Sequence, residues 1–160
     1  MRTPQLFIMV KEPRAGRVKT RLGKGIGMTR AAWWFRHQTR RLLRVLGRDV
    51  RWQTVLAVSP DVEGLQSRIW PDHLPRWPQG RGDLGQRMAA IFRHAPSGPV
   101  VIIGADIPGI TPALIAKAFR ALGDHDAVFG PAYDGGYWLV GLKRGAGAVP
   151  VHLFENVRWS

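Results

Sequence analysis

Short, continuous apolar runs alternate with longer stretches of helical periodicity, and this alternation is what most constrains the fold. Residues 5–10 and 99–104 are almost entirely apolar, and each run is bounded by prolines or glycine. Such runs are typical of parallel strands that helices cover on both faces. Between these runs, apolar residues recur at helical spacing over about 18 residues and end near Gly47. The chain is therefore predicted to be an α/β protein.

The remaining elements follow from similar signals. Residues 54–58, 127–129 and 137–142 are predicted strands, and Asp83 can cap a helix that runs through residue 94. Thr111 precedes Pro112 as an N-cap, so a third helix is expected over residues 111–122. Residues 60–78 carry too many prolines for a central strand, and we expect a loop with at most one helical turn. We predict one domain over residues 1–160, a Rossmann-like three-layer sandwich with a mainly parallel mixed sheet.

Composition excludes several classes of protein. The 160 residues include no Cys, which rules out a disulfide framework, thiolate metal sites and a cysteine nucleophile. The first apolar run is too short for the core of a signal peptide, and no run approaches the roughly 18 residues of a membrane helix. We expect a cytoplasmic protein without a membrane span.

Positive charge is concentrated near the N-terminus. Residues 1–51 contain fourteen Lys and Arg against two acids, which accounts for +12 of the net charge of +13. A field of this kind attracts phosphates, whether on a nucleotide, a nucleic acid or an anionic lipid. Arg outnumbers Lys by 19 to 5, so the excess can equally reflect genomic base composition. Both interpretations remain open at this point.

The loop after the first strand is a candidate phosphate site. Lys11, Lys19 and Arg21 lie in one short segment with Gly16, which can let backbone N–H groups approach an anion. Several cationic donors at the start of a helix are what a diphosphate or triphosphate requires. The spacing is not that of a Walker A loop, and an ordinary solvated basic loop is the alternative.

Asp106 follows the most apolar predicted strand, residues 99–104. In open α/β sheets ligands bind beyond the carboxyl ends of the strands, so this carboxylate is placed at the base of the cleft. It is our predicted metal ligand and a predicted catalytic residue. Mg²⁺ or Mn²⁺ needs only one or two protein carboxylates when phosphate oxygens complete the shell. The alternative role is to cap the turn before Thr111.

A third candidate segment, residues 130–137, joins two predicted strands. Asp134, Gly135 and Gly136 form a sequence that favours a hairpin turn, and the local pattern by itself supports that interpretation. The functional alternative is that the glycines let an acceptor approach while the Asp134 carboxylate acts as a base or an orienting group.

The fourth segment, residues 79–88, matches the pattern G-x-G-x-x-G. A dinucleotide-binding fingerprint should follow a central strand, whereas two prolines precede this one, so we do not favour NAD. Gly82 and Asp83 are instead predicted to form a second wall of the nucleotide cleft. The five His show no helical metal-binding pair, and no G-x-S-x-G motif is present, which removes zinc and serine hydrolases.

Four segments in this order, residues 10–22, 79–88, 103–108 and 130–142, resemble the bacterial rSAM/selenodomain-associated transferases. That family is glycosyltransferase-like and more distantly similar to 2-phospho-lactate guanylyltransferase and the molybdenum-cofactor guanylyltransferases. The resemblance implies the GT-A fold of nucleotide-diphospho-sugar transferases with a divalent cation. It also implies that Lys11, Gly16, Lys19 and Arg21 hold phosphates, Asp106 the metal, and the turn Asp134-Gly135-Gly136 the acceptor.

Chains of that family continue into a further strand and helix, so we expect this one to lack the C-terminal part. The leading hypothesis is a metal-dependent transferase that takes a nucleotide-sugar or nucleoside triphosphate and a small-molecule acceptor. Nucleotidyl transfer with release of pyrophosphate is the first alternative. The others are a nucleic-acid-binding module built on the Arg-rich helix, which we do not favour, and a catalytically silent homologue. The oligomeric state stays open.

Overall fold

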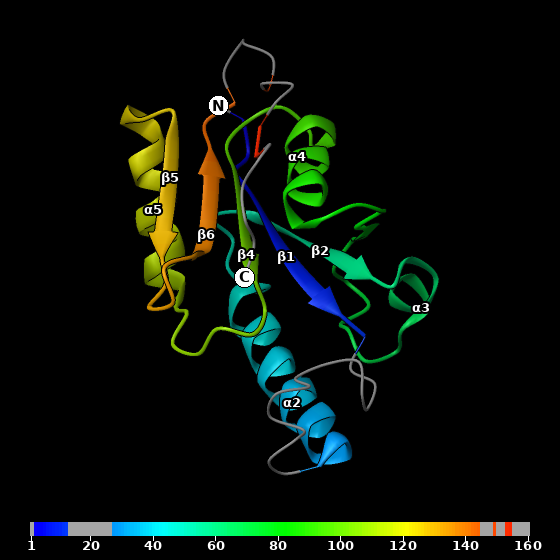
Figure 1. The fold of residues 1–160 in the computed structure, drawn as a ribbon. Helices are drawn as coiled ribbons and strands as arrows, with labels where there is room; N and C mark the ends of the chain where they lie inside the picture. The colour runs from blue at the N-terminus through cyan, green and yellow to red at the C-terminus, as the bar shows by residue number, and fades with distance from the viewer. Residues whose placement is uncertain (1, 13–26, 145–148, 150–152, 155–160) are drawn as a thin grey trace.

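The computed structural model describes residues 2–12, 27–144, 149, 153 and 154. Strands and helices alternate along the described chain, as predicted (Figure 1). In chain order the elements are β1 Gln5–Lys11, α2 Met28–Leu46, β2 Gln53–Ser59, α3 Asp61–Gln66, β3 Arg76–Pro78, α4 Leu84–His94, β4 Val100–Gly104, α5 Pro112–Asp124, β5 Ala127–Pro131 and β6 Tyr137–Leu142.

The strands form one mixed sheet in the order β3-β2-β1-β4-β6-β5. The first four strands are parallel, whereas β6 runs antiparallel to β4 and β5 antiparallel to β6. Ile8 of β1 pairs with Leu56 of β2 on one side and with Ile103 of β4 on the other. This register places the most apolar strands in the middle of the sheet and confirms the predicted mainly parallel mixed arrangement.

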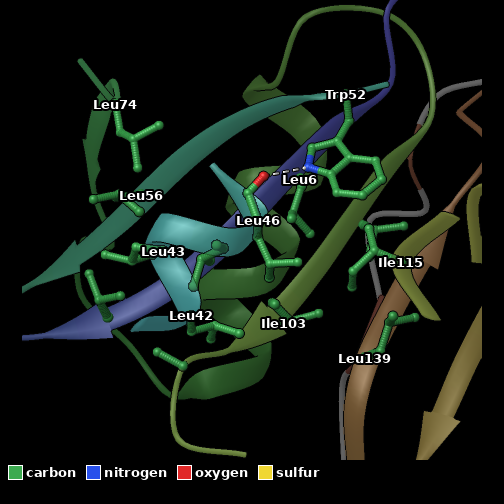
Figure 2. Close-up of a cluster of buried hydrophobic side chains, with 14 of the residues drawn as sticks. Leu6, Leu42, Leu43, Leu46, Trp52, Leu56, Leu74, Ile103, Ile115 and Leu139 are labelled. Atoms are coloured by element: carbon green, nitrogen blue, oxygen red, sulfur yellow. Dashed lines mark hydrogen bonds between the residues drawn. The ribbon is translucent and has the colours of Figure 1, made fainter. Parts of the chain in front are cut away.

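Helices cover both faces of the sheet, and the strand sequences explain why. Successive residues of a strand point to opposite faces, so a strand buried on both sides must be apolar throughout. In β1, Leu6 and Ile8 pack with α2 and α5, whereas Phe7 packs on the other face with α4. Figure 2 shows the first of these two cores, in which Leu43 and Leu46 of α2 meet Leu6.

The C-terminus of α2 is fixed by residues of the next strand. The last carbonyl groups of a helix have no partner within it and need donors from elsewhere. The Leu46 carbonyl accepts hydrogen bonds from the indole Nε1 of Trp52 and the hydroxyl of Thr54, each 3.3 Å long. The Trp52 bond is the dashed line in Figure 2. This end of α2 is therefore held at the amino end of β2.

The predicted helix starts are confirmed. Asp83 Oδ1 accepts from the backbone N–H of Gln86 at 2.8 Å, and the Gln86 side chain accepts from the Asp83 N–H at 2.9 Å. This reciprocal pair is a capping box. Thr111 caps α5 by accepting from the N–H of Leu114, directly before Pro112.

The expectation for residues 60–78 was wrong in part. The six-residue α3 lies where a loop with one helical turn was expected, and the three-residue β3 is a strand that the sequence did not predict. β3 pairs only with β2 at the edge of the sheet, where Pro78 can be accommodated because an edge strand leaves one row of N–H groups unpaired. Within the described ranges, no helix has the length and hydropathy of a membrane span.

Candidate active site

The carboxyl ends of β1 and β4 bring Lys11 and Asp106 to the same edge of the sheet. Met9 pairs with Gly104, and Lys11 and Asp106 each come two residues after their member of this pair. Neighbouring strands lie about 4.8 Å apart, so the two residues follow adjacent strand ends. Both side chains are exposed. The structure thus places the predicted metal ligand and the first predicted phosphate ligand at the ends of two adjacent strands, at the expected edge of the sheet.

The turn between β5 and β6 reaches this edge as well. Since β6 is antiparallel to β4, its first residues lie beside the end of β4: Leu139 pairs with Ile103, and Tyr137 pairs with Pro131 of β5. In Figure 1 the arrowheads of β1 and β5 point to the lower part of the molecule, whereas β6 points upward. Asp106 therefore lies at the end of a strand whose neighbours carry Lys11 on one side and this turn on the other.

Asp134 has the local role that hairpin chemistry predicts. Its Oδ1 accepts from the Gly136 N–H at 3.0 Å, and the Gly136 carbonyl accepts from the Ala132 N–H at 2.8 Å. Gly135 has a φ of +87°, a conformation that side-chain-bearing residues rarely adopt. The turn thus needs glycine for its own geometry, and it holds the exposed Asp134 carboxylate in a defined orientation at the edge of the sheet.

Gly104 makes room for the Asp106 carboxylate. A Cβ atom at Gly104 would lie 3.2 Å from Asp106 Oδ1, so this oxygen is positioned over the end of β4. Across the described residues, no three His, Cys, Asp or Glu side chains gather as a ready-made metal cage. A single exposed carboxylate fits the way Mg²⁺ binds when substrate phosphates supply the other ligands. The donor set at Asp106 is thus compatible with a substrate-assisted cation site.

Glu12 is a second carboxylate at this edge that sequence reasoning did not single out. It follows Lys11 directly, and its backbone N–H donates to the Ser59 carbonyl at 2.8 Å. Its Oε2 atom is buried and has no hydrogen-bond partner within the described part of the chain. The three predicted phosphate ligands Gly16, Lys19 and Arg21 lie outside the described residues.

The segment after β3 forms a wall beside the ends of β1 and β2. Gly80 donates its N–H to Asp61 Oδ1 at 3.1 Å, and Gly82 has a φ of +103°. A Cβ at Gly82 would collide with the side-chain oxygen of Gln86. Asp83 is exposed and caps α4. The structure thus gives Gly82 and Asp83 a structural role, and their contact with a nucleotide stays a prediction.

Gln79 organises this wall, and no sequence signal beyond its position after Pro78 indicates this role. The side chain is 8% exposed, and its Nε2 donates to the carbonyls of Val10 at 3.2 Å and Ala57 at 2.8 Å. Its Oε1 accepts from Arg87 Nη1 at 3.2 Å. One buried amide therefore joins the carboxyl ends of β1 and β2 to α4, and one of its bonds ends on the residue that precedes Lys11.

The G-x-G-x-x-G pattern of residues 79–88 follows β3, which is an edge strand. A dinucleotide-binding fingerprint follows a central strand, so this position agrees with the expectation that the motif does not bind NAD.

The family model described as "Uncharacterized protein conserved in bacteria" (DUF2064) matches residues 42–160. The chain belongs to the DUF2064 family. No curated protein matches this DUF2064 member.

Several solved structures share the fold of this chain. A Desulfovibrio desulfuricans G20 protein, provisionally called a nucleotide-diphospho-sugar transferase, is 32% identical with a TM-score of 0.87, over 99% of this chain and 70% of that one. The 4-diphosphocytidyl-2C-methyl-D-erythritol synthase of Anaerococcus prevotii DSM 20548 has 12% identity and a TM-score of 0.56, over 89% and 71% of the two chains. A hypothetical transferase from Thermus thermophilus has 14% identity and a TM-score of 0.50, over 89% and 66%. The fold is the predicted nucleotide-diphospho-sugar transferase type.

Proposed function

We propose that this DUF2064 member is a metal-dependent, glycosyltransferase-like enzyme that takes a nucleotide-sugar or a nucleoside triphosphate as donor. The observation that carries the proposal is the meeting of Lys11, Asp106 and the Asp134 turn at the carboxyl edge of one sheet. Cation, carboxylate and turn come from three distant parts of the sequence. The provisional name of the Desulfovibrio relative and the resemblance to the rSAM/selenodomain-associated transferases support the same class.

Each part of this edge has a chemical role in the proposal. Lys11, together with Gly16, Lys19 and Arg21 of the following loop, binds the donor phosphates through charge-assisted hydrogen bonds. Asp106 holds Mg²⁺ or Mn²⁺, which supplies charge stabilisation for the leaving phosphate or pyrophosphate. Asp134 orients the acceptor hydroxyl and takes its proton, and the backbone at Gly135 and Gly136 lets the acceptor approach.

Two reactions share this electrostatic requirement. In glycosyl transfer an acceptor oxygen forms a bond to the sugar C1 while the bond from C1 to the diphosphate breaks, and a nucleoside diphosphate leaves. In nucleotidyl transfer the acceptor attacks the α-phosphorus of a triphosphate, and pyrophosphate leaves. Mass spectrometry of the products separates the two, because only the second releases pyrophosphate.

The test of the proposed site is a thermal-shift panel of nucleotides and nucleotide-sugars with and without Mn²⁺. We expect one donor class to raise the melting temperature further when Mn²⁺ is present, and Asp106→Asn to abolish that metal-dependent part. Asp124→Asn is the matched control, because Asp124 is exposed at the C-terminal end of α5. Equal metal dependence in the two variants would remove Asp106 from the site. No shift with any donor at low salt would favour a catalytically silent homologue.

The nucleic-acid alternative rests on the exposed arginines of α2. It predicts polymer binding that falls steeply with salt and is unchanged by Asp106→Asn.

A further inference from the structure

A second site with its own chemistry lies between the C-terminal half of α2 and the loop from α3 to β3. A pocket of about 330 Å³ opens there, and Arg40, Arg44, Arg48 and Arg68 line it together with Asp72 and His73. We refer to these residues as the arginine pocket. Leu46, at the end of α2, is bonded to Trp52 and Thr54 at the amino end of β2. The pocket is therefore displaced from the carboxyl edge that carries Lys11 and Asp106.

The arginines converge from two walls of the pocket. Arg40 and Arg44 are four residues apart on α2 and so share a face of the helix, and Arg48 follows just past its end. Arg68 belongs to the opposite wall. Among residues 2–12 and 27–144, no ion pair neutralises any of these four side chains. Asp72 alone opposes them within the lining, which leaves about three positive charges in excess.

The opposite wall is held in place by Arg76, which is not part of the lining. Its guanidinium donates to four backbone carbonyls, those of Gly64, Leu65, Ser67 and Trp70, at 2.5 to 3.3 Å. These bonds fix the loop that carries Arg68. Arg68 therefore lines the pocket from a fixed backbone opposite the arginines of α2, and an anion bound between the two walls would neutralise their mutual repulsion.

The lining also has apolar members. Leu43, Ile69 and Trp70 contribute to it, and Leu43 and Trp70 are each 1% exposed. The exposed arginines therefore supply most of the surface that a ligand can reach.

We infer that the arginine pocket binds a phosphorylated small molecule with the charge of a diphosphate ester. Arginine is the side chain best suited to phosphate, because its planar fork donates two parallel hydrogen bonds. The excess of about three charges matches two phosphate groups better than one, since a single phosphate carries about −2. The volume is near the lower end of the range for small-molecule sites, roughly 300–1,000 Å³. The ligand is therefore a compact molecule whose phosphate groups lie between the arginines.

This site is independent of the proposed catalytic one, and ADP in EDTA is the probe that separates them. Isothermal titration would compare Arg40→Ala/Arg44→Ala with Arg36→Ala/Arg41→Ala. Both double variants remove two exposed arginines from α2, but Arg36 and Arg41 do not line the pocket. We expect the first pair to weaken ADP binding at least about tenfold and the second less than about threefold. Adenosine, which lacks the phosphates, is expected not to bind.

Several results would overturn the inference. Equal losses in the two double variants would show that ADP senses the general field of α2, as a nucleic acid or an anionic surface would. ADP binding that needs Mn²⁺, or that Asp106→Asn abolishes, would assign the ligand to the carboxyl edge instead. If Arg40→Ala/Arg44→Ala does not fold, Arg68→Ala on the opposite wall provides the same test and is expected to weaken binding severalfold. If ADP binds without a metal ion and only the pocket variants lose this binding, the arginine pocket is supported even if the proposed catalytic function fails.

Discussion

Replacing Gln79 by Leu tests whether one buried amide holds the candidate site together. Leu has a similar volume but no polar atoms, so the change removes three hydrogen bonds with little change in packing. Two of them end on the carbonyls of Val10 and Ala57, and the third comes from Arg87. The Val10 carbonyl directly precedes Lys11. The substitution should therefore loosen the same strand end that presents the predicted phosphate ligand.

The expected loss follows from the kinds of bond involved. Each neutral hydrogen bond contributes about 0.5–1.5 kcal/mol net, and the bond from the Arg87 guanidinium contributes somewhat more. Burial of the Leu methyl groups offsets part of this, so we expect Gln79→Leu to lower the free energy of unfolding by about 2–3 kcal/mol. For a chain of this size the melting temperature should fall by about 5–10 °C. Urea unfolding, followed by circular dichroism, measures the free energy directly.

Gln66→Leu is the matched control, because Gln66 is exposed at the end of α3. The chemical change is identical, but no hydrogen bond of the Gln66 side chain is recorded within the described ranges. We expect its effect to stay within about 0.5 kcal/mol. If the two variants unfolded at the same urea concentration, the three bonds of Gln79 would contribute nothing measurable, and its role as organiser of the wall would be refuted.

Two further changes test local electrostatics and capping. Asp83→Ala removes the capping box of α4 and should cost about 1 kcal/mol in urea unfolding, whereas an unchanged midpoint would mean that the cap contributes nothing. A hydrogen bond from Arg51 holds the pKa of Asp49 below its ordinary value, so the folded chain binds fewer protons here than the unfolded chain. Its stabilising effect is present above the unfolded pKa and disappears as the pH falls through the folded one. Asp49→Asn should therefore lower the melting temperature at about pH 7 but not at about pH 2, and a constant difference would contradict this.

Much of the fold could be predicted because its signals are local. The strand at residues 99–104 is apolar throughout, and Thr111-Pro112 and Asp83 each mark a helix start at the residue itself. The edge at which ligands bind then follows from strand direction. For that reason the sequence alone predicts Asp106 at the end of a central strand, and the structure shows Lys11 at the end of the strand beside it.

The parts that could not be predicted depend on contacts between distant residues. β3 is a strand only because β2 offers it an edge, and the loop before it is shaped by the four bonds from Arg76. Gln79 is indistinguishable in the sequence from any polar residue between a proline and a glycine. Its importance comes from the carbonyl groups of two strands, which lie 69 and 22 residues away along the chain.

The positive charge of the N-terminal third shows how the fold changes the meaning of a sequence feature. In the sequence it is one basic region, yet the structure places Lys11 at the carboxyl edge and Arg44 beyond the middle of α2. Arg44 lines the arginine pocket together with Arg68 of the loop before β3, whereas Lys11 follows the strand end next to that of Asp106. One basic region of the sequence therefore contributes cations to two proposed sites. The metal-dependent experiment with Asp106→Asn and the metal-free experiment with Arg40→Ala/Arg44→Ala test these two sites separately.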